Sequence, residues 1–291
     1  MYTILLTISL TIFNQGLIYD QPSAKNFAMN STLIAVENSA SPSFCNPGGL
    51  AFLQYNKAGN ITLGNKKLFG LSYVQHFPMA NLGAEFFYEH FTCEIFPLEN
   101  RPRTFLNVLL GRKIVKYVGL GLSFKLSSDF LTHKHYIFSD VGFLIKTPIS
   151  GLNTGICLKE LYLKNIKEHP SQNRFVYGLS YRLPTFFYSS LLFSFEYNKQ
   201  FLNVKEFSDY YHLVEDAYFS YGLSLTFQKH FEGCLSSSFY RYFHEVNGGV
   251  GLNWQRFSVF ISQCKTLLPF FGEFHFFTPE KVYLLTFNLK L

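Results

Sequence analysis

The sequence predicts an all-β fold, a transmembrane antiparallel β-barrel, and three observations predict it. The stretch 282–291, VYLLTFNLKL, alternates apolar or aromatic residues with mostly polar ones, which puts each set on one face of a strand. Only 15% of the 291 residues are charged, whereas soluble proteins usually have about 25%. No apolar run approaches the roughly 20 residues that a spanning helix needs. Since only helices and closed barrels satisfy every backbone group in lipid, a barrel is the remaining choice.

The alternation recurs from about residue 61 to the last strand. In the stretches 118–126, 175–183 and 219–227, one face is apolar or aromatic throughout, and the other carries mostly glycine, serine and charged residues. The small and polar face suits a crowded lumen, and the apolar face suits lipid. We therefore expect the apolar faces to contact outer-membrane lipid, and we expect the protein to reside in a bacterial outer membrane.

The sequence indicates about fourteen strands, and twelve strands remain an alternative. Short turns and longer loops alternate along the chain, as they do in outer-membrane barrels, where the short turns are periplasmic. The expected strands are 61–67, 68–77, 82–93, 103–114, 117–128, 135–147, 151–163, 174–183, 186–198, 217–228, 231–242, 246–254, 256–264 and 280–291.

The last strand is expected to close the barrel by pairing back to about residues 61–67. Its apolar face resembles the C-terminal signal that the outer-membrane assembly machinery recognises. The residues of this face are Tyr283, Leu285, Phe287, Leu289 and Leu291.

The chain divides into three parts. Residues 1–24 are expected to be a signal peptide and leader, because 3–13 is an apolar run of signal-peptide length; a first apolar strand is the alternative. Residues 25–60 show no clean alternation, and residues 61–291 form the barrel. Within the middle part, Ser43 or Asn46 can cap a short helix that has Pro47 in its first turn.

The composition argues against nucleic-acid binding, metal binding and catalysis. The net charge of +6 comes without a run of Lys and Arg. The 5 cysteines form no Cys-x-x-Cys pair, so their spacing indicates neither a zinc site nor a dithiol redox motif. One disulfide bond remains an alternative. No Gly-x-Ser-x-Gly motif is present, and His133 and His135 form a loop pair of the kind that usually faces solvent. We expect no cofactor, no metal and no enzyme; a lipid-acting enzyme ranks lowest among the alternatives.

Alternation also places charged residues on the lumen side, where Glu85 and Glu89 are expected to join them. In a low-dielectric lumen such charges need partners, so we favour ion pairs that tie the wall to the segment that precedes it. The alternative is a polar conduit with a basic bias. The set is Lys125, Asp140, Lys146, Lys159, Arg174, Arg182, Glu196 and Lys290.

Two local patterns point to a family. The stretch 30–53 resembles the segment that precedes the first barrel strand in the FadL/PorV/PorQ superfamily of outer-membrane proteins. The stretch 139–161 resembles that family's central hairpin through Asp140, Gly142 and Gly155, and Glu160 stands where Asn is usual. The match to the first pattern lies in Asn46, Pro47, Gly48, Gly49, Leu50 and Ala51, with Gly48 in place of the usual Ala.

The resemblance implies a fourteen-stranded barrel with residues 25–60 folded into the lumen as a plug. It also implies one of two functions. PorV- and PorQ-type members serve type IX secretion and surface assembly, and their partners are secretion subunits or secreted cargo. FadL-type members pass hydrophobic small molecules across the outer membrane. The compact loops favour the first function, and a FadL-like channel is the alternative.

Two loops, 199–216 and 266–278, are rich in aromatic residues. Exposed aromatic clusters mark sites for partners or ligands, or rest on the membrane interface. We favour the interface role.

Overall fold

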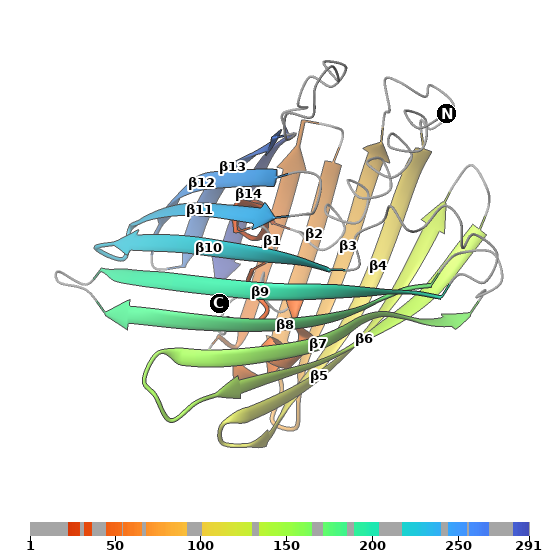
Figure 1. The fold of residues 1–291 in the computed structure, drawn as a ribbon, viewed down its shortest axis with the longest axis horizontal. Coiled ribbons are helices and arrows are strands. Elements are labelled where there is room, and N and C mark those ends of the chain that lie inside the picture. Colours follow the sequence, from red (N-terminus) through yellow and green to blue (C-terminus); the bar gives the residue numbers. More distant parts are fainter. Residues whose placement is uncertain are drawn as a thin grey trace.

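The strands of the chain form one closed antiparallel barrel in which each strand pairs with its neighbours in sequence (Figure 1). The computed structural model describes residues 23–29, 32–36, 45–53, 55–65, 68–91, 101–129, 134–164, 171–184, 189–203, 217–239, 244–254, 256–267 and 282–290. Among these residues, no helix is long and apolar enough to cross a membrane.

The barrel has fourteen strands, which confirms the expected number over twelve. Most bounds lie within a few residues of those that alternation predicts. The strands are β1 (Lys57–Gly64), β2 (Leu68–His76), β3 (Asn81–Phe91), β4 (Arg101–Val115), β5 (Val118–Asp129), β6 (Lys134–Lys146), β7 (Leu152–Lys164), β8 (Ser171–Pro184), β9 (Ser190–Asn203), β10 (Ala217–Phe227), β11 (Phe231–Phe239), β12 (His244–Asn253), β13 (Phe257–Leu267) and β14 (Val282–Lys290).

The barrel closes where β14 pairs with β1, and Ile61 lies opposite Phe287 in this ladder. This is the predicted closing pair. The expectation that the first strand begins at residue 61 is wrong by four residues, because β1 begins at Lys57. The inner face of its first half carries Ala58 and Asn60, and the outer face carries Gly59, so no apolar stripe marks the start.

The strands direct apolar side chains outward and small or polar ones inward. On β5, Phe124 is 52% exposed on the outer face, whereas its neighbour Ser123 is 1% exposed on the inner face. The same holds on β12 for the outer Val250 and the inner Asn247. An outer surface of this composition is suited to lipid contact, and the crowded inner face faces the N-terminal part of the chain.

The described parts of the N-terminal segment lie inside the ring of strands. They are a short α-helix, α2 (Ala24–Ala28), a turn at 32–36, and a 3-10 helix, η1 (Pro47–Phe52). Figure 1 shows these red and orange elements enclosed by the strands. Helix α2 packs on β11 to β14, and η1 packs on β3 to β6. The segment therefore crosses the lumen from one side of the wall to the other.

The ladder between β6 and β7 is irregular at two points. The pairing shifts register between Ile137 and Phe138 and again between Ser139 and Val141, and opposite the second shift Glu160 adopts a left-handed backbone with φ 58°. Such a bulge lets two successive residues point to the same side. Here Lys159 is buried and Glu160 pairs with the inner-face Arg174. Two charged side chains in a row thus face the lumen.

Candidate functional site

The centre of the candidate site is the contact between η1 and the wall. Asn46 caps η1: its side-chain carbonyl accepts a hydrogen bond of 2.9 Å from the Gly48 backbone amide. Its amide group donates to two backbone carbonyls, those of Ile34 at 2.7 Å and Phe143 at 2.9 Å. One side chain therefore joins η1 to the turn at 32–36 and to strand β6. All residues of η1 are buried.

Glycines on the inner face of the wall make room for this segment. A methyl group added at Gly121 would overlap the Pro47 carbonyl, and one at Gly142 would overlap the Asn46 side chain. On the segment itself, a methyl group at Gly48 would lie 2.8 Å from the backbone of β6. A Cβ atom at any of these positions would force the backbones apart. Further inner glycines that face the segment are Gly111, Gly119, Gly155, Gly178, Gly222 and Gly249.

Hydroxyl groups on the wall bond to the rest of the segment. Thr286 accepts a hydrogen bond of 2.7 Å from the Ala24 amide, and Ser236 donates one of 2.7 Å to the Ala28 carbonyl. Ser180 donates a 2.8 Å bond to the Ala35 carbonyl. These bonds satisfy backbone groups that irregular chain would otherwise bury unpaired.

An ion pair fixes α2 to the wall. The Lys25 ammonium lies 2.5 Å from a carboxylate oxygen of Glu232, which is 8% exposed. Burial lowers the pKa of Lys25, but the charge of Glu232, its hydrogen bond to Lys25 and the neighbouring Cys234 together raise it, so the pKa lies above its ordinary value. Lys25 is therefore charged at neutral pH, and the pair is an ionic contact between segment and wall.

An apolar layer also lies between the segment and the wall. From the segment, Met29, Leu33 and Val36 are buried. From the wall, Phe87 and Phe260 point inward into the same cluster. The other wall members are Leu68, Leu192, Cys234 and Leu284, with Phe105 packed against them. A water-filled barrel has a polar interior, so this apolar inner layer distinguishes the chain from an open porin.

The inner charges that the sequence predicts fall into two groups. The first group lies on the inner face of the strands, away from the short turns. Asp140 pairs with Lys125 at 2.7 Å, and Arg174 pairs with Glu160 at 2.7 Å. Lys159 and Glu196 are buried on the same face, and Glu85 also faces inward. These ion pairs join wall residue to wall residue. Among the described residues, an ion pair that ties the wall to the segment is formed by Lys25 and Glu232. The side chain of Glu89 lies outside the described residues.

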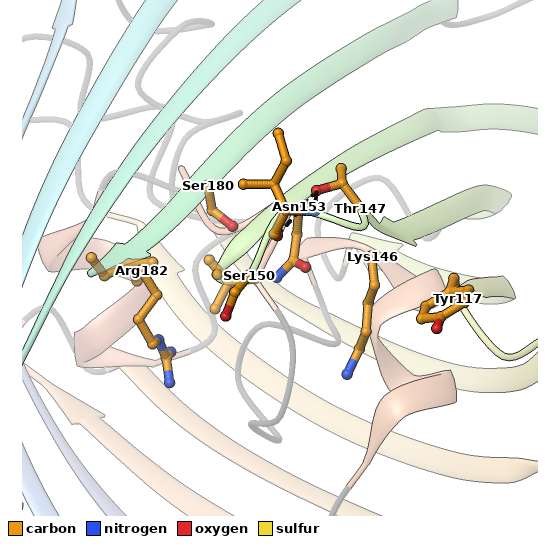
Figure 2. Close-up of a pocket in the computed structure, with 11 residues that line it drawn as sticks. Tyr117, Lys146, Thr147, Ser150, Asn153, Ser180 and Arg182 are labelled. Atoms are coloured by element: carbon orange, nitrogen blue, oxygen red, sulfur yellow. Dashed lines mark hydrogen bonds between the residues drawn. The ribbon is translucent and has the colours of Figure 1, made fainter. Parts of the chain in front are cut away.

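The second group stands at the short-turn end of the lumen. The Lys146 ammonium lies 4.5 Å from the centre of the Phe52 ring, and Lys290 lies 5.0 Å from that of Tyr55. Arg182 faces the same end from β8. A cavity of about 190 Å³ lies between Lys146 and Arg182 (Figure 2). Its wall is completed by residues of β7, β8, β9 and two turns, and by Val36 of the segment.

The predicted closing strand has its two faces as alternation implies. Tyr283 and Leu289 are 43% and 47% exposed on the outside, and Leu285 and Phe287 are half-buried there. Thr286, on the other face, bonds to Ala24 of the segment. Leu291 lies outside the described residues, as do most of the two aromatic loops and the loop residue His133.

One serine and one histidine meet on the outer face. Ser128 and His135 lie opposite each other on β5 and β6, and the Ser128 hydroxyl is 2.8 Å from Nδ1 of His135. A hydrolytic site also needs N–H donors that stabilise an oxyanion. The neighbouring backbone groups belong to the continuous β5–β6 ladder. The pair therefore supplies two groups of a triad, and the loop 130–133 that adjoins it lies outside the described residues.

Sequence reasoning did not predict which wall residues contact the segment, and Glu232 and Asn81 are two examples. Glu232 shares its face with Cys234 and Ser236, so alternation on β11 was a sufficient signal for its inward direction. Asn81 donates a 2.6 Å hydrogen bond to the Leu50 carbonyl of η1, and no sequence pattern marks it. Of the five cysteines, Cys45, Cys157 and Cys234 are buried and belong to no disulfide.

Comparison with known proteins identifies the fold. No protein-family model matches the chain, and no curated protein matches it. The chain is similar to the TodX ΔS2S3 mutant, a monoaromatic hydrocarbon channel, with 10% identity and a TM-score of 0.61 over 92% of this chain and 99% of that chain. It is also similar to a FadL homologue of Pseudomonas aeruginosa, with 8% identity and a TM-score of 0.59 over 92% and 98%.

At these identities the likeness shows the fold, a β-barrel of the bacterial outer-membrane kind. The apolar outer face and the absence of a sheet edge agree with it. The protein is thus an outer-membrane β-barrel.

Proposed function

We propose that this protein is a FadL-like channel that carries small hydrophobic molecules across the outer membrane. The observation that carries the proposal is the apolar layer between the N-terminal segment and the wall, around Met29, Leu33, Phe87 and Phe260. Binding sites for small molecules are mostly apolar with a few placed polar groups. The fold likeness to a hydrocarbon channel and a FadL homologue supports the same choice.

A route through the lumen requires the segment to shift. All fourteen strand pairs are joined, so the described wall offers no break between strands. The described parts of the segment are held to the wall by hydrogen bonds, each worth about 1 kcal/mol net, by the Lys25–Glu232 ion pair and by apolar contacts. Local rearrangement of such a segment is inexpensive in free energy compared with opening the ladder.

The test is uptake into cells with an intact lipopolysaccharide layer. The fluorescent probe 1-N-phenylnaphthylamine is hydrophobic, and nitrocefin is a polar control. Cells that express the protein should take up the naphthylamine several-fold faster than cells with an empty vector, while nitrocefin entry stays unchanged. Equal naphthylamine rates, with the protein present in the outer membrane, would contradict the channel.

A second candidate function is secretion or surface assembly of the PorV/PorQ kind. The compact loops of the sequence favour it, and neither the Asn46–Ala51 motif, which the superfamily shares, nor the fold separates it from a channel. Deletion of the gene in its native host should then change the set of secreted or surface-attached proteins. An unchanged set together with probe uptake would leave the channel as the function.

The proposal is non-enzymatic. The Ser128–His135 pair is the observation that would favour a lipid-acting enzyme, and an assay of lipid hydrolysis tests it. Purified protein in phospholipid vesicles should release no fatty acid. Release that Ser128→Ala abolishes would instead establish a lipid-acting enzyme.

A further inference from the structure

The geometry points to a binding site for a phosphate group in the cavity at the short-turn mouth of the lumen. This end is periplasmic if the barrel follows the rule that short turns lie there. The inference goes beyond the proposed channel, because it concerns a polar anion and not a hydrophobic cargo. Either one can fail without the other.

The cavity is built from several elements that meet under the segment. Lys146 ends β6, Asn153 is the second residue of β7, and Ser180 and Arg182 lie near the end of β8. Its volume of about 190 Å³ is far above the roughly 10–15 Å³ that one water needs, so it can hold a solvated group. Figure 2 shows Lys146 and Arg182 on opposite sides, with Ser150 and Asn153 between them.

Among the described residues that line the cavity, the charged ones are of one sign. Lys146 and Arg182 contribute two cations, and none of the described lining residues is acidic. Lys113 stands close by, with its ammonium 5.5 Å from the same Phe52 ring that Lys146 contacts at 4.5 Å. Among the described residues at this end, Glu232 carries a carboxylate, and it is bound to Lys25. Like charges gathered in a concave surface raise its affinity for anions.

The donors match a tetrahedral dianion. Arginine presents a planar fork of N–H donors that fits phosphate oxygens, and lysine supplies a compact point charge. The Asn153 amide and the Ser150 hydroxyl add neutral donors around the same space, whereas the Thr147 hydroxyl donates to the Leu152 carbonyl. A phosphate carries about −1.5 to −2 charge at neutral pH, which balances two cations better than a carboxylate does.

The phosphate can belong to a soluble molecule or to a lipid headgroup. The apolar members of the lining, Val36, Ile149 and Leu192, would accept the adjoining part of either ligand. The shared chemistry is the phosphate itself. The two sources are distinguished by their probes, inorganic phosphate and the short-chain lipid dihexanoyl phosphatidate.

The experiment measures phosphate binding to the full-length protein in neutral detergent. Calorimetric titration with inorganic phosphate at low salt should show saturable binding, and the phosphorus resonance should broaden. The variant K146Q/R182Q should weaken the affinity at least tenfold. Displacement by dihexanoyl phosphatidate would identify a headgroup as an acceptable ligand, and lack of displacement would assign the site to soluble phosphates.

The matched control is K57Q/R256Q, which removes two exposed cations from the same end outside the cavity. Its phosphate affinity should equal that of the wild type. Both variants are checked for the heat-resistant band of a folded barrel. Undetectable binding by the wild type, equal loss in both variants, or an equal affinity for chloride would overturn the assignment.

Discussion

The side-chain amide of Asn46 donates a 2.9 Å hydrogen bond to the backbone carbonyl of Phe143, 97 residues away in sequence. The same amide group bonds to Ile34 of the segment, and its oxygen caps η1. The Asn46 side chain therefore caps η1, joins η1 to the turn at 32–36, and attaches the segment to strand β6.

Asn46→Ala should loosen the segment without unfolding the barrel. Two buried carbonyls would lose a donor, at a cost of about 2 kcal/mol to the docked state. That free energy corresponds to a roughly 30-fold larger open population. The measurement is the rate of maleimide labelling at Cys45, which is fully buried, in a protein whose other cysteines are replaced by serine. The exposed Asn56→Ala is the control, and equal rates for all three proteins would refute the assigned role.

Gly121→Ala should displace η1 from the wall. The added methyl group would overlap the Pro47 carbonyl, whereas Gly233 on β11 has nothing within 4 Å of the same position. Overpacking of this kind typically costs about 1–3 kcal/mol. In planar bilayers the ion conductance of Gly121→Ala should exceed that of the wild type, and Gly233→Ala should match the wild type. A conductance unchanged by Gly121→Ala would mean that the segment does not limit ion flow.

Lys25 and Glu232 should show energetic coupling. Removing the lysine leaves the Glu232 carboxylate buried without this ammonium, so Lys25→Met should be more harmful alone than beside Glu232→Gln. A double-mutant cycle on the Cys45 labelling rates should give a coupling free energy of about 1–3 kcal/mol. Additive effects of the two substitutions would show that the ion pair contributes nothing to docking.

Deletion of 286–291 should prevent assembly. This end of β14 pairs with β1 on one side and β13 on the other, as in Phe287 with Ile61 and with Val259. Without it the ladder cannot close, and two edges would be left in lipid. The measurement is the amount of heat-resistant barrel in the outer-membrane fraction. A truncated protein that still inserts would show that closure does not need these pairs.

Alternation was sufficient to predict the barrel, its strand number and its closing pair. The signal is strong because each strand faces lipid on one side and a crowded lumen on the other, so composition switches at every residue. It failed at Lys57–Gly59, where both faces carry small or polar residues. It also gave no warning of the bulge at Glu160, which depends on pairing with β6.

The candidate site was only partly predictable. The segment motif was visible through Asn46 and Pro47, but its contacts with Phe143 and Gly121 join residues far apart in sequence. Alternation assigned the inner charges a face but no partners. Lys125 and Arg174 pair within the wall, and Lys146 and Arg182 gather around a cavity. Only the register of the closed barrel decides between these arrangements.

The central claim, that hydrophobic molecules pass when the segment moves, can be tested by locking the segment. A Cβ atom at Gly178 would lie 3.3 Å from Cβ of Ile34, close to the roughly 3.5–4.5 Å of a disulfide. The variant I34C/G178C, with the native cysteines replaced, should take up 1-N-phenylnaphthylamine when reduced and lose that uptake when oxidised. Equal uptake in the reduced and oxidised states, with the disulfide verified, would contradict a route that depends on movement of the segment. Absence of uptake in both states and in the wild type would contradict the channel itself.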